Sequence, residues 1–140
     1  MRSTTPQVAI LAFFSVLMAS CGGGGEAFSP SEAATSAEEV DCSSAQIAQT
    51  VEMKNTSFKP DTTRISPGEV VKWVNRDGFA HTVTNGTGGS AGAFDSGNIS
   101  GSGGTYCLKF PKKGNVRYFC TVHGASAMSG AVGVGHEPSK

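Results

Sequence analysis

The sequence YFCTVHGASAMSG, from Tyr118 to Gly130, decides how the rest of the chain is interpreted. It brings a cysteine, a histidine and a methionine (Cys120, His123 and Met128) into one short segment. A thiolate, imidazoles and a weak thioether are typical of copper electron-transfer sites, in which one Cys and two His lie in a plane and a Met binds axially. The segment therefore predicts three copper ligands and requires a second histidine from elsewhere.

Of the 3 histidines in the chain, His81 is the best candidate for that ligand. It follows the apolar, strand-like run VVKWVN at 70–75, whereas His136 lies in the polar tail HEPSK and is expected to be a solvated side chain. Because His81 and Cys120 lie far apart in the sequence, only the fold can assemble the site.

The sequence beyond the first forty residues predicts an all-β domain. It has many short apolar runs broken by Gly, Asn and Asp, and almost no segment with the period of a helix. Seven or eight short strands indicate a Greek-key β-sandwich or barrel. The expected strands are 50–53, 62–65, 70–75, 80–84, 106–110, 116–120 and 131–135.

These motifs resemble the cupredoxins, and among them most closely the plastocyanin- and pseudoazurin-like proteins. The resemblance rests on Cys-x2-His-x4-Met before a final strand and on a histidine after a V-x-W-x-N strand, and it covers about residues 49–134. It implies one type 1 (blue) copper per chain, bound by His81, Cys120, His123 and Met128, and a role as a one-electron carrier.

Residues beside the ligands have expected roles too, the two threonines because of their positions and the apolar residues because of the resemblance. Thr82 and Thr121 are expected to hydrogen-bond near the metal and tune it. An apolar patch around the second histidine is expected to dock redox partners. Its members in this chain are Phe79, Ala80, Gly124 and Ala125. Thr82 and Val122 stand where plastocyanins usually have Asn and Pro, so the reduction potential does not follow from the resemblance.

Residues 1–20 have the pattern of an export signal. A single basic residue, Arg2, precedes the apolar run VAILAFFSVLM, which is too short to span a bilayer as a permanent helix. Ala-Ser-Cys follows and resembles the lipobox of bacterial lipoproteins, which implies that Cys21 is lipid-modified and anchors the protein to a membrane. Ordinary signal cleavage that leaves Cys21 free is the alternative.

The segment that follows is expected to be a flexible tether. Residues 21–41 are rich in Gly, Ser, Ala and Glu and contain few large apolar side chains, so they cannot bury enough surface to fold. The predicted organisation is therefore a signal at 1–20, a lipidated Cys and tether at 21–41, and a copper-binding domain at 42–140.

The 4 cysteines of the chain can be assigned separately. With Cys21 assigned to lipid and Cys120 to metal, Cys42 and Cys107 remain, and in an exported protein we expect them to form a disulfide. Cys107 alternates with Tyr106 and the other apolar residues of its strand, so it should face away from the core. A free Cys42 is the alternative.

An enzyme is not expected. Small copper oxidases and nitrite reductases need a further copper held by additional histidines, and only His136 is spare. No Cys-x2-Cys-His motif for a c-type haem is present. A zinc-binding module or a copper chaperone without electron transfer is the remaining alternative, although zinc prefers four firm ligands and Met is a poor one.

The expected partners are transient redox proteins, such as a cytochrome, an oxidase or a reductase. The basic cluster Lys109, Lys112, Lys113 and Arg117 could steer an acidic partner, but it is too weak and unpatterned for nucleic acid. We expect a monomer on the periplasmic or cell-surface side of a bacterial membrane.

Overall fold

A computed structural model describes residues 37–140. The signal-like segment at 1–20, the lipidation site Cys21 and most of the predicted tether lie outside the described residues. Within 37–140 the structure contains strands and no helix, which confirms the all-β prediction. That part of the chain accordingly has no helix long and apolar enough to cross a membrane.

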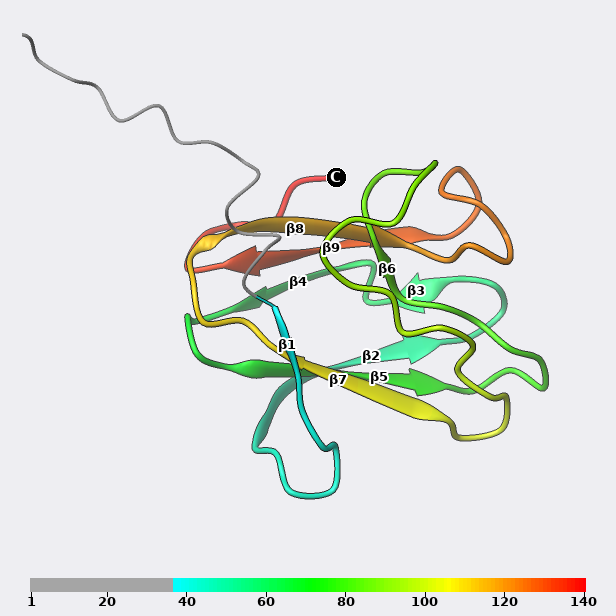
Figure 1. The fold of residues 1–140 in the computed structure, drawn as a ribbon, viewed down its shortest axis with the longest axis horizontal. Coiled ribbons are helices and arrows are strands. Elements are labelled where there is room, and N and C mark those ends of the chain that lie inside the picture. Colours follow the sequence, from blue (N-terminus) through cyan, green and yellow to red (C-terminus); the bar gives the residue numbers. More distant parts are fainter. Residues whose placement is uncertain (1–36) are drawn as a thin grey trace, which may run out of the picture.

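Two sheets pack face to face and enclose the core (Figure 1). The first sheet has the order β1-β7-β5-β2-β3, and the second has the order β4-β9-β8-β6. Pairs β2–β5 and β4–β9 are parallel and the other neighbours are antiparallel. In chain order, the strands are β1 (Glu38–Glu39), β2 (Ile47–Met53), β3 (Phe58–Lys59), β4 (Thr62–Ile65), β5 (Val70–Asn75), β6 (Thr84–Asn85), β7 (Thr105–Lys109), β8 (Gly114–Phe119) and β9 (Ser129–Val134).

Aromatic side chains from both sheets meet in the centre of the sandwich. Trp73 on β5 has no exposed surface and meets Tyr118 of β8 edge to face, with ring centroids 5.3 Å apart. Tyr106 and Phe110 pack against the same indole from the β7 side. Burial of these large rings supplies much of the hydrophobic stabilisation of the domain. Trp73 is thus a core residue.

The strand expected at 80–84 is largely absent, and this prediction was wrong. Two isolated bridges, His81 with Ile99 and Thr84 with Asp95, and the two-residue β6 replace it. The reason is that the amides of Thr82 and Val83 donate to side-chain atoms, namely the sulfur of Cys120 and the hydroxyl of Ser96. Amides used in this way cannot join a ladder, because a strand needs its donors for neighbouring carbonyls.

The ordered domain begins before residue 42, so the tether prediction was wrong for residues 38–41. Glu38 and Glu39 form the edge strand β1 on β7, and the amide of Val40 donates to the carbonyl of Cys107. The composition of this segment is polar because an edge strand buries little side-chain surface. The bond between Cys42 and Cys107 explains why so polar a segment stays on the sheet.

The direction of β8 sets the two ends of the sandwich. The strand starts after the turn that carries Lys112 and Lys113 and ends just before Cys120 (Figure 1). The basic turn and the loop after Cys120 therefore lie at opposite ends of the domain. An acidic partner attracted by these lysines would therefore approach the end of the domain away from the metal loop.

Candidate metal centre

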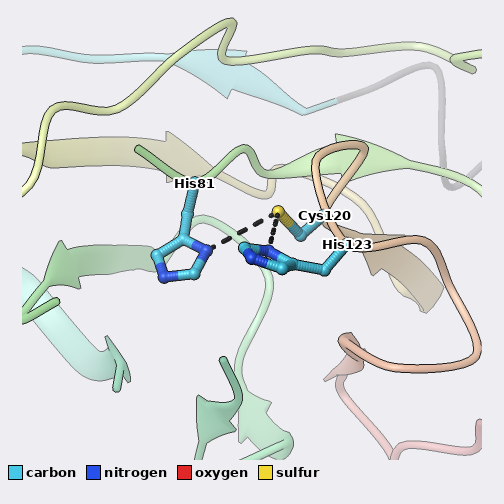
Figure 2. A group of neighbouring side chains, drawn as sticks. All are labelled: His81, Cys120 and His123. Atoms are coloured by element: carbon cyan, nitrogen blue, oxygen red, sulfur yellow. Dashed lines mark hydrogen bonds between the residues drawn. The ribbon is translucent and has the colours of Figure 1, made fainter. Parts of the chain in front are cut away.

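Three of the predicted ligands meet at one end of the sandwich. Figure 2 shows both imidazoles directed at the sulfur of Cys120. The Cys120 Sγ lies 3.7 Å from Nδ1 of His81 and 3.5 Å from Nδ1 of His123. His81 and Cys120 are completely buried, whereas His123 is partly exposed. The cluster thus has a buried side and one edge that reaches the surface.

The spacing of these atoms fits a shared metal ion. Bond lengths of about 2.0 Å to nitrogen and about 2.3 Å to sulfur, as zinc has, at an angle of about 120° give a sulfur–nitrogen separation of about 3.7 Å. The observed separations from Cys120 to His81 and His123 are 3.7 and 3.5 Å. A thiolate with two imidazoles is a soft donor set that suits copper. The residues therefore fit the predicted cofactor.

His81 is held with one particular nitrogen toward the cluster. Its Nε2 lies 2.8 Å from a carboxylate oxygen of Asp77, which can only accept a hydrogen bond when ionised. The imidazole proton is therefore on Nε2, and the lone pair of Nδ1 is free for a metal. Burial acts to raise the pKa of Asp77, but the amides of Asn55 and Thr56 and the His81 N–H together lower it below its usual value.

The loop from Cys120 to Met128 is closed by its own backbone. The Cys120 N–H donates to the Met128 carbonyl at 3.0 Å, and the Gly124 N–H donates to the Cys120 carbonyl at 2.9 Å. Gly124 has a φ of 80°, a left-handed conformation that glycine adopts without steric cost. Met128 is 1% exposed and belongs to the core. The fourth predicted ligand is thus buried and tied directly to Cys120.

The two threonines expected beside the metal are joined to each other and to the sulfur. The Thr82 N–H donates to Cys120 Sγ at 3.4 Å, and the Thr121 N–H donates to the Thr82 hydroxyl at 2.8 Å. Sequence reasoning missed the continuation of this network, in which Thr84 contacts the Thr82 hydroxyl and donates to Asp95. A hydroxyl two residues further along the chain, such as that of Thr84, carries no recognisable sequence signal.

Apolar side chains surround the exposed edge of His123. Phe79 and Val122 are 50% and 53% exposed, which is unusual for large apolar residues in the described domain. The Phe79 ring centroid lies 5.0 Å from that of His81 and 5.7 Å from that of His123. The other residues expected in the docking patch, Ala80, Gly124 and Ala125, are partly exposed.

Asp77 and Asn75 contact the loop and the side chain of His81, and the sequence did not reveal either residue. The Asn75 side-chain amide donates to the carbonyls of Phe79 and Ile99, and its oxygen accepts from the Asp77 N–H. Asn75 therefore shapes the loop that carries His81. An Asp in a polar turn is ordinary in sequence, and the only available signal was its position four residues before a predicted ligand.

The remaining cysteines are linked. The structure joins Cys42 and Cys107 by a disulfide with a Cα–Cα distance of 5.4 Å. Cys107 is 1% exposed yet is not a member of the core cluster, because the linked segment covers it on the outer face of the sheet. Among residues 37–140, Cys120 is the one free cysteine. No other described thiol therefore competes for the metal.

Comparison with known proteins agrees with this arrangement. Residues 45–135 match the family described as copper binding proteins, plastocyanin/azurin family. The chain is 32% identical over 83 residues to plastocyanin from Scenedesmus fuscus, covering 55% of this chain and 85% of that protein. It is 34% identical over 86 residues to plastocyanin from Ginkgo biloba, covering 56% of this chain and 87% of that protein.

Solved structures show the same fold. A structure of oxidized amicyanin carrying one substitution superposes with a TM-score of 0.59 at 21% identity, over 71% of this chain and 98% of that chain. With the His–Cys–His cluster, the family match indicates a single copper ion as the cofactor. The chain belongs to the plastocyanin/azurin family of copper-binding proteins.

Proposed function

We propose that this protein is a mononuclear blue copper protein that carries one electron at a time between redox partners and has no catalytic activity of its own. The observation that carries the proposal is that the ligand atoms of His81, His123 and Cys120 lie within 4.8 Å of one another. Copper supplies the one-electron chemistry by cycling between Cu(I) and Cu(II).

Each ligand has a separate task in this proposal. Cys120 binds as a thiolate and provides the main electronic coupling to the surface. His81 is the buried, rigidly held imidazole, and His123 is the imidazole at the surface edge. Met128 would supply a weak thioether ligand and would help to set the potential. Because the loop and the sandwich fix these donors, little rearrangement is needed between the two oxidation states.

Partners are proposed to dock at the apolar edge around His123, formed by Phe79, Ala80, Gly124 and Ala125. Small, transient interfaces are typical of electron-transfer encounters. The partner classes are those expected from the sequence, namely a cytochrome, an oxidase or a reductase. An uncharged patch beside a partly exposed ligand gives a short path for the electron.

The proposed location is outside the cytoplasm, with the lipid on Cys21 as the anchor. The export-like sequence at 1–20 supports this location, and so does the disulfide between Cys42 and Cys107, because such bonds persist in oxidising compartments. The test is mass spectrometry of the protein from bacterial membranes. A Cys21→Ser variant should leave the membrane fraction, and an unmodified Cys21 in the parent protein would exclude the anchor.

The function is tested by the visible spectrum of the full chain after addition of Cu(II). We expect intense blue absorption that ascorbate bleaches and that the Cys120→Ala variant lacks. A colourless or faintly blue protein would contradict electron transfer at this site. The alternative without electron transfer, a copper chaperone or other metal-binding module, would then take its place.

A further inference from the structure

The carboxylate that faces the buried histidine has no assigned role. We propose that Asp77 is a positioning residue of the copper centre, which orients His81 and favours Cu(II) over Cu(I), so that it lowers the reduction potential. This inference rests on the proposed electron-transfer function. It concerns the hydrogen bond that His81 makes through its other ring nitrogen, and not the set of copper ligands itself.

The contact between the two side chains is short and sheltered. Asp77 Oδ2 lies 2.8 Å from His81 Nε2, and the exposed fractions of the two side chains are 9% and 0%. Water therefore screens the pair weakly, and the carboxylate charge acts strongly on the imidazole. The carboxylate polarises the ring and increases the electron density on Nδ1, which points at the Cys120 sulfur.

The carboxylate is itself held in place from the opposite side. The Asn55 N–H donates to Oδ1 of Asp77 at 2.8 Å, and the Thr56 N–H donates to Oδ2 at 3.1 Å. Both Asn55 and Thr56 have a φ of 54°, in the left-handed region. That region is unusual for a β-branched residue such as Thr. The turn between β2 and β3 accepts this backbone strain while presenting two adjacent amides to one carboxylate.

The neighbouring cation does not neutralise Asp77. Arg76, the adjacent residue, pairs instead with Glu52 at 2.9 Å on the exposed surface. Among the described residues, no Lys or Arg pairs with Asp77, and the side chain that contacts its carboxylate is the His81 imidazole. The negative charge of Asp77 is thus directed at the imidazole.

The sign of the effect follows from charge. A carboxylate that accepts the Nε2–H makes the other ring nitrogen a stronger donor and fixes the ring plane. A stronger donor and a nearby negative charge stabilise Cu(II) more than Cu(I), because Coulomb energy scales with the charge of the ion. Removing the carboxylate should therefore raise the potential.

The experiment compares Asp77→Asn with Glu52→Gln in the copper-loaded full chain. Both variants remove one negative charge, but Glu52 is paired with Arg76 and does not touch His81. For Asp77→Asn, we expect Cu(II) affinity to fall about 10–100-fold, with a smaller loss for Cu(I). Each tenfold fall in the ratio of Cu(II) affinity to Cu(I) affinity raises the potential by about 59 mV for one electron. Glu52→Gln should leave the potential unchanged.

A second measurement does not depend on the folding of a variant. In the Cu(I) form of the unaltered protein, nuclear magnetic resonance should show a His81 Nε2–H that exchanges slowly with water. Rapid exchange of that proton would overturn the proposal. An Asp77→Asn potential equal to the parent value, or one matched by Glu52→Gln, would overturn it as well. Failure of the proposed function is distinguishable, because then the unaltered protein has no bleachable blue copper.

Discussion

The backbone N–H of Cys120 and the carbonyl of Met128 are joined by a hydrogen bond of 3.0 Å, so the two ends of the metal loop are fixed to each other. The amide of Met128 is bound in turn by the carbonyl of Gly124 within the loop. The backbone thereby sets the position of Met128 independently of any bond from its sulfur. Its side chain can consequently be changed without rebuilding the loop.

Replacement of Met128 by Leu should raise the reduction potential and alter the blue spectrum while the protein stays folded. The swap nearly conserves volume and should cost less than about 1.5 kcal/mol of stability, whereas Met128→Ala should cost about 2–5 kcal/mol through a cavity. The potential should rise because the Met128 thioether, the proposed fourth ligand, is lost. Met53→Leu, at a fully buried methionine on β2, is the control and should not change the potential. Equal potentials for Met128→Leu and the parent would exclude axial ligation.

Removal of the disulfide should destabilise the domain without changing the copper spectrum. The bond between Cys42 and Cys107 closes a sequence separation of 65 residues. In the chain-entropy model, this loop contributes about 4 kcal/mol. The double variant with Ser at both positions should lose about that much in urea unfolding. Because the bond lies on the outer face of β7, the blue absorption should remain, and a bleached spectrum would contradict this placement.

The part of the site that lies in one loop could be predicted from sequence because its ligands are only a few residues apart. Cys120, His123 and Met128 belong to one loop whose spacing alone suggests copper. His81 was accessible to the same reasoning because few histidines exist and one follows an apolar strand. The strands predicted at 62–65 and 70–75 have the bounds of β4 and β5 in the structure.

The parts that could not be predicted depend on long-range contacts. The carboxylate of Asp77 is held by the amides of Asn55 and Thr56, more than twenty residues earlier in the chain. The segment around Thr82 reads as a strand, but its amide donates to the sulfur of a ligand. Strand β1 is polar and is ordered by a covalent bond, which periodicity does not detect.

The stability of the domain should fall in alkaline solution as Tyr106 ionises. Burial, with the charges of Glu39 and Asp95, raises the pKa of Tyr106 to about 12. An unfolded tyrosine ionises near pH 10. The contribution of neutral Tyr106 to stability is therefore fully present below about pH 10, and it is lost as the pH rises toward the pKa of the folded state.

Ultraviolet absorbance measures this directly, because the chain has only 2 tyrosines. The titration curve of the parent minus that of Tyr106→Phe should have its midpoint near pH 12 in the folded protein and near pH 10 in urea. A folded-state midpoint near 10 would show that Tyr106 is not sheltered from water.

Placing a charge at the copper edge should slow electron exchange between two copies of the protein. Val122 is 53% exposed and lies directly before His123, so Val122→Lys adds a positive charge to the proposed docking patch with little loss of packing. Two copies that meet edge to edge would then repel. We expect the self-exchange rate to fall on the order of tenfold at low salt. Line broadening in mixtures of the Cu(I) and Cu(II) forms measures this rate.

The self-exchange rate reports on docking and not on a changed potential. Donor and acceptor are the same protein, so the driving force is zero whatever the potential of the variant. Salt near 0.1 M should restore most of the rate, since it screens charges over about 10 Å. Ser66→Lys is the matched control, because the turn after β4 contacts Phe110 at the opposite end of the sandwich and the charge there does not meet the partner. If Ser66→Lys slows exchange as much as Val122→Lys, electrons do not leave through the edge of His123, and the docking surface lies elsewhere on the domain.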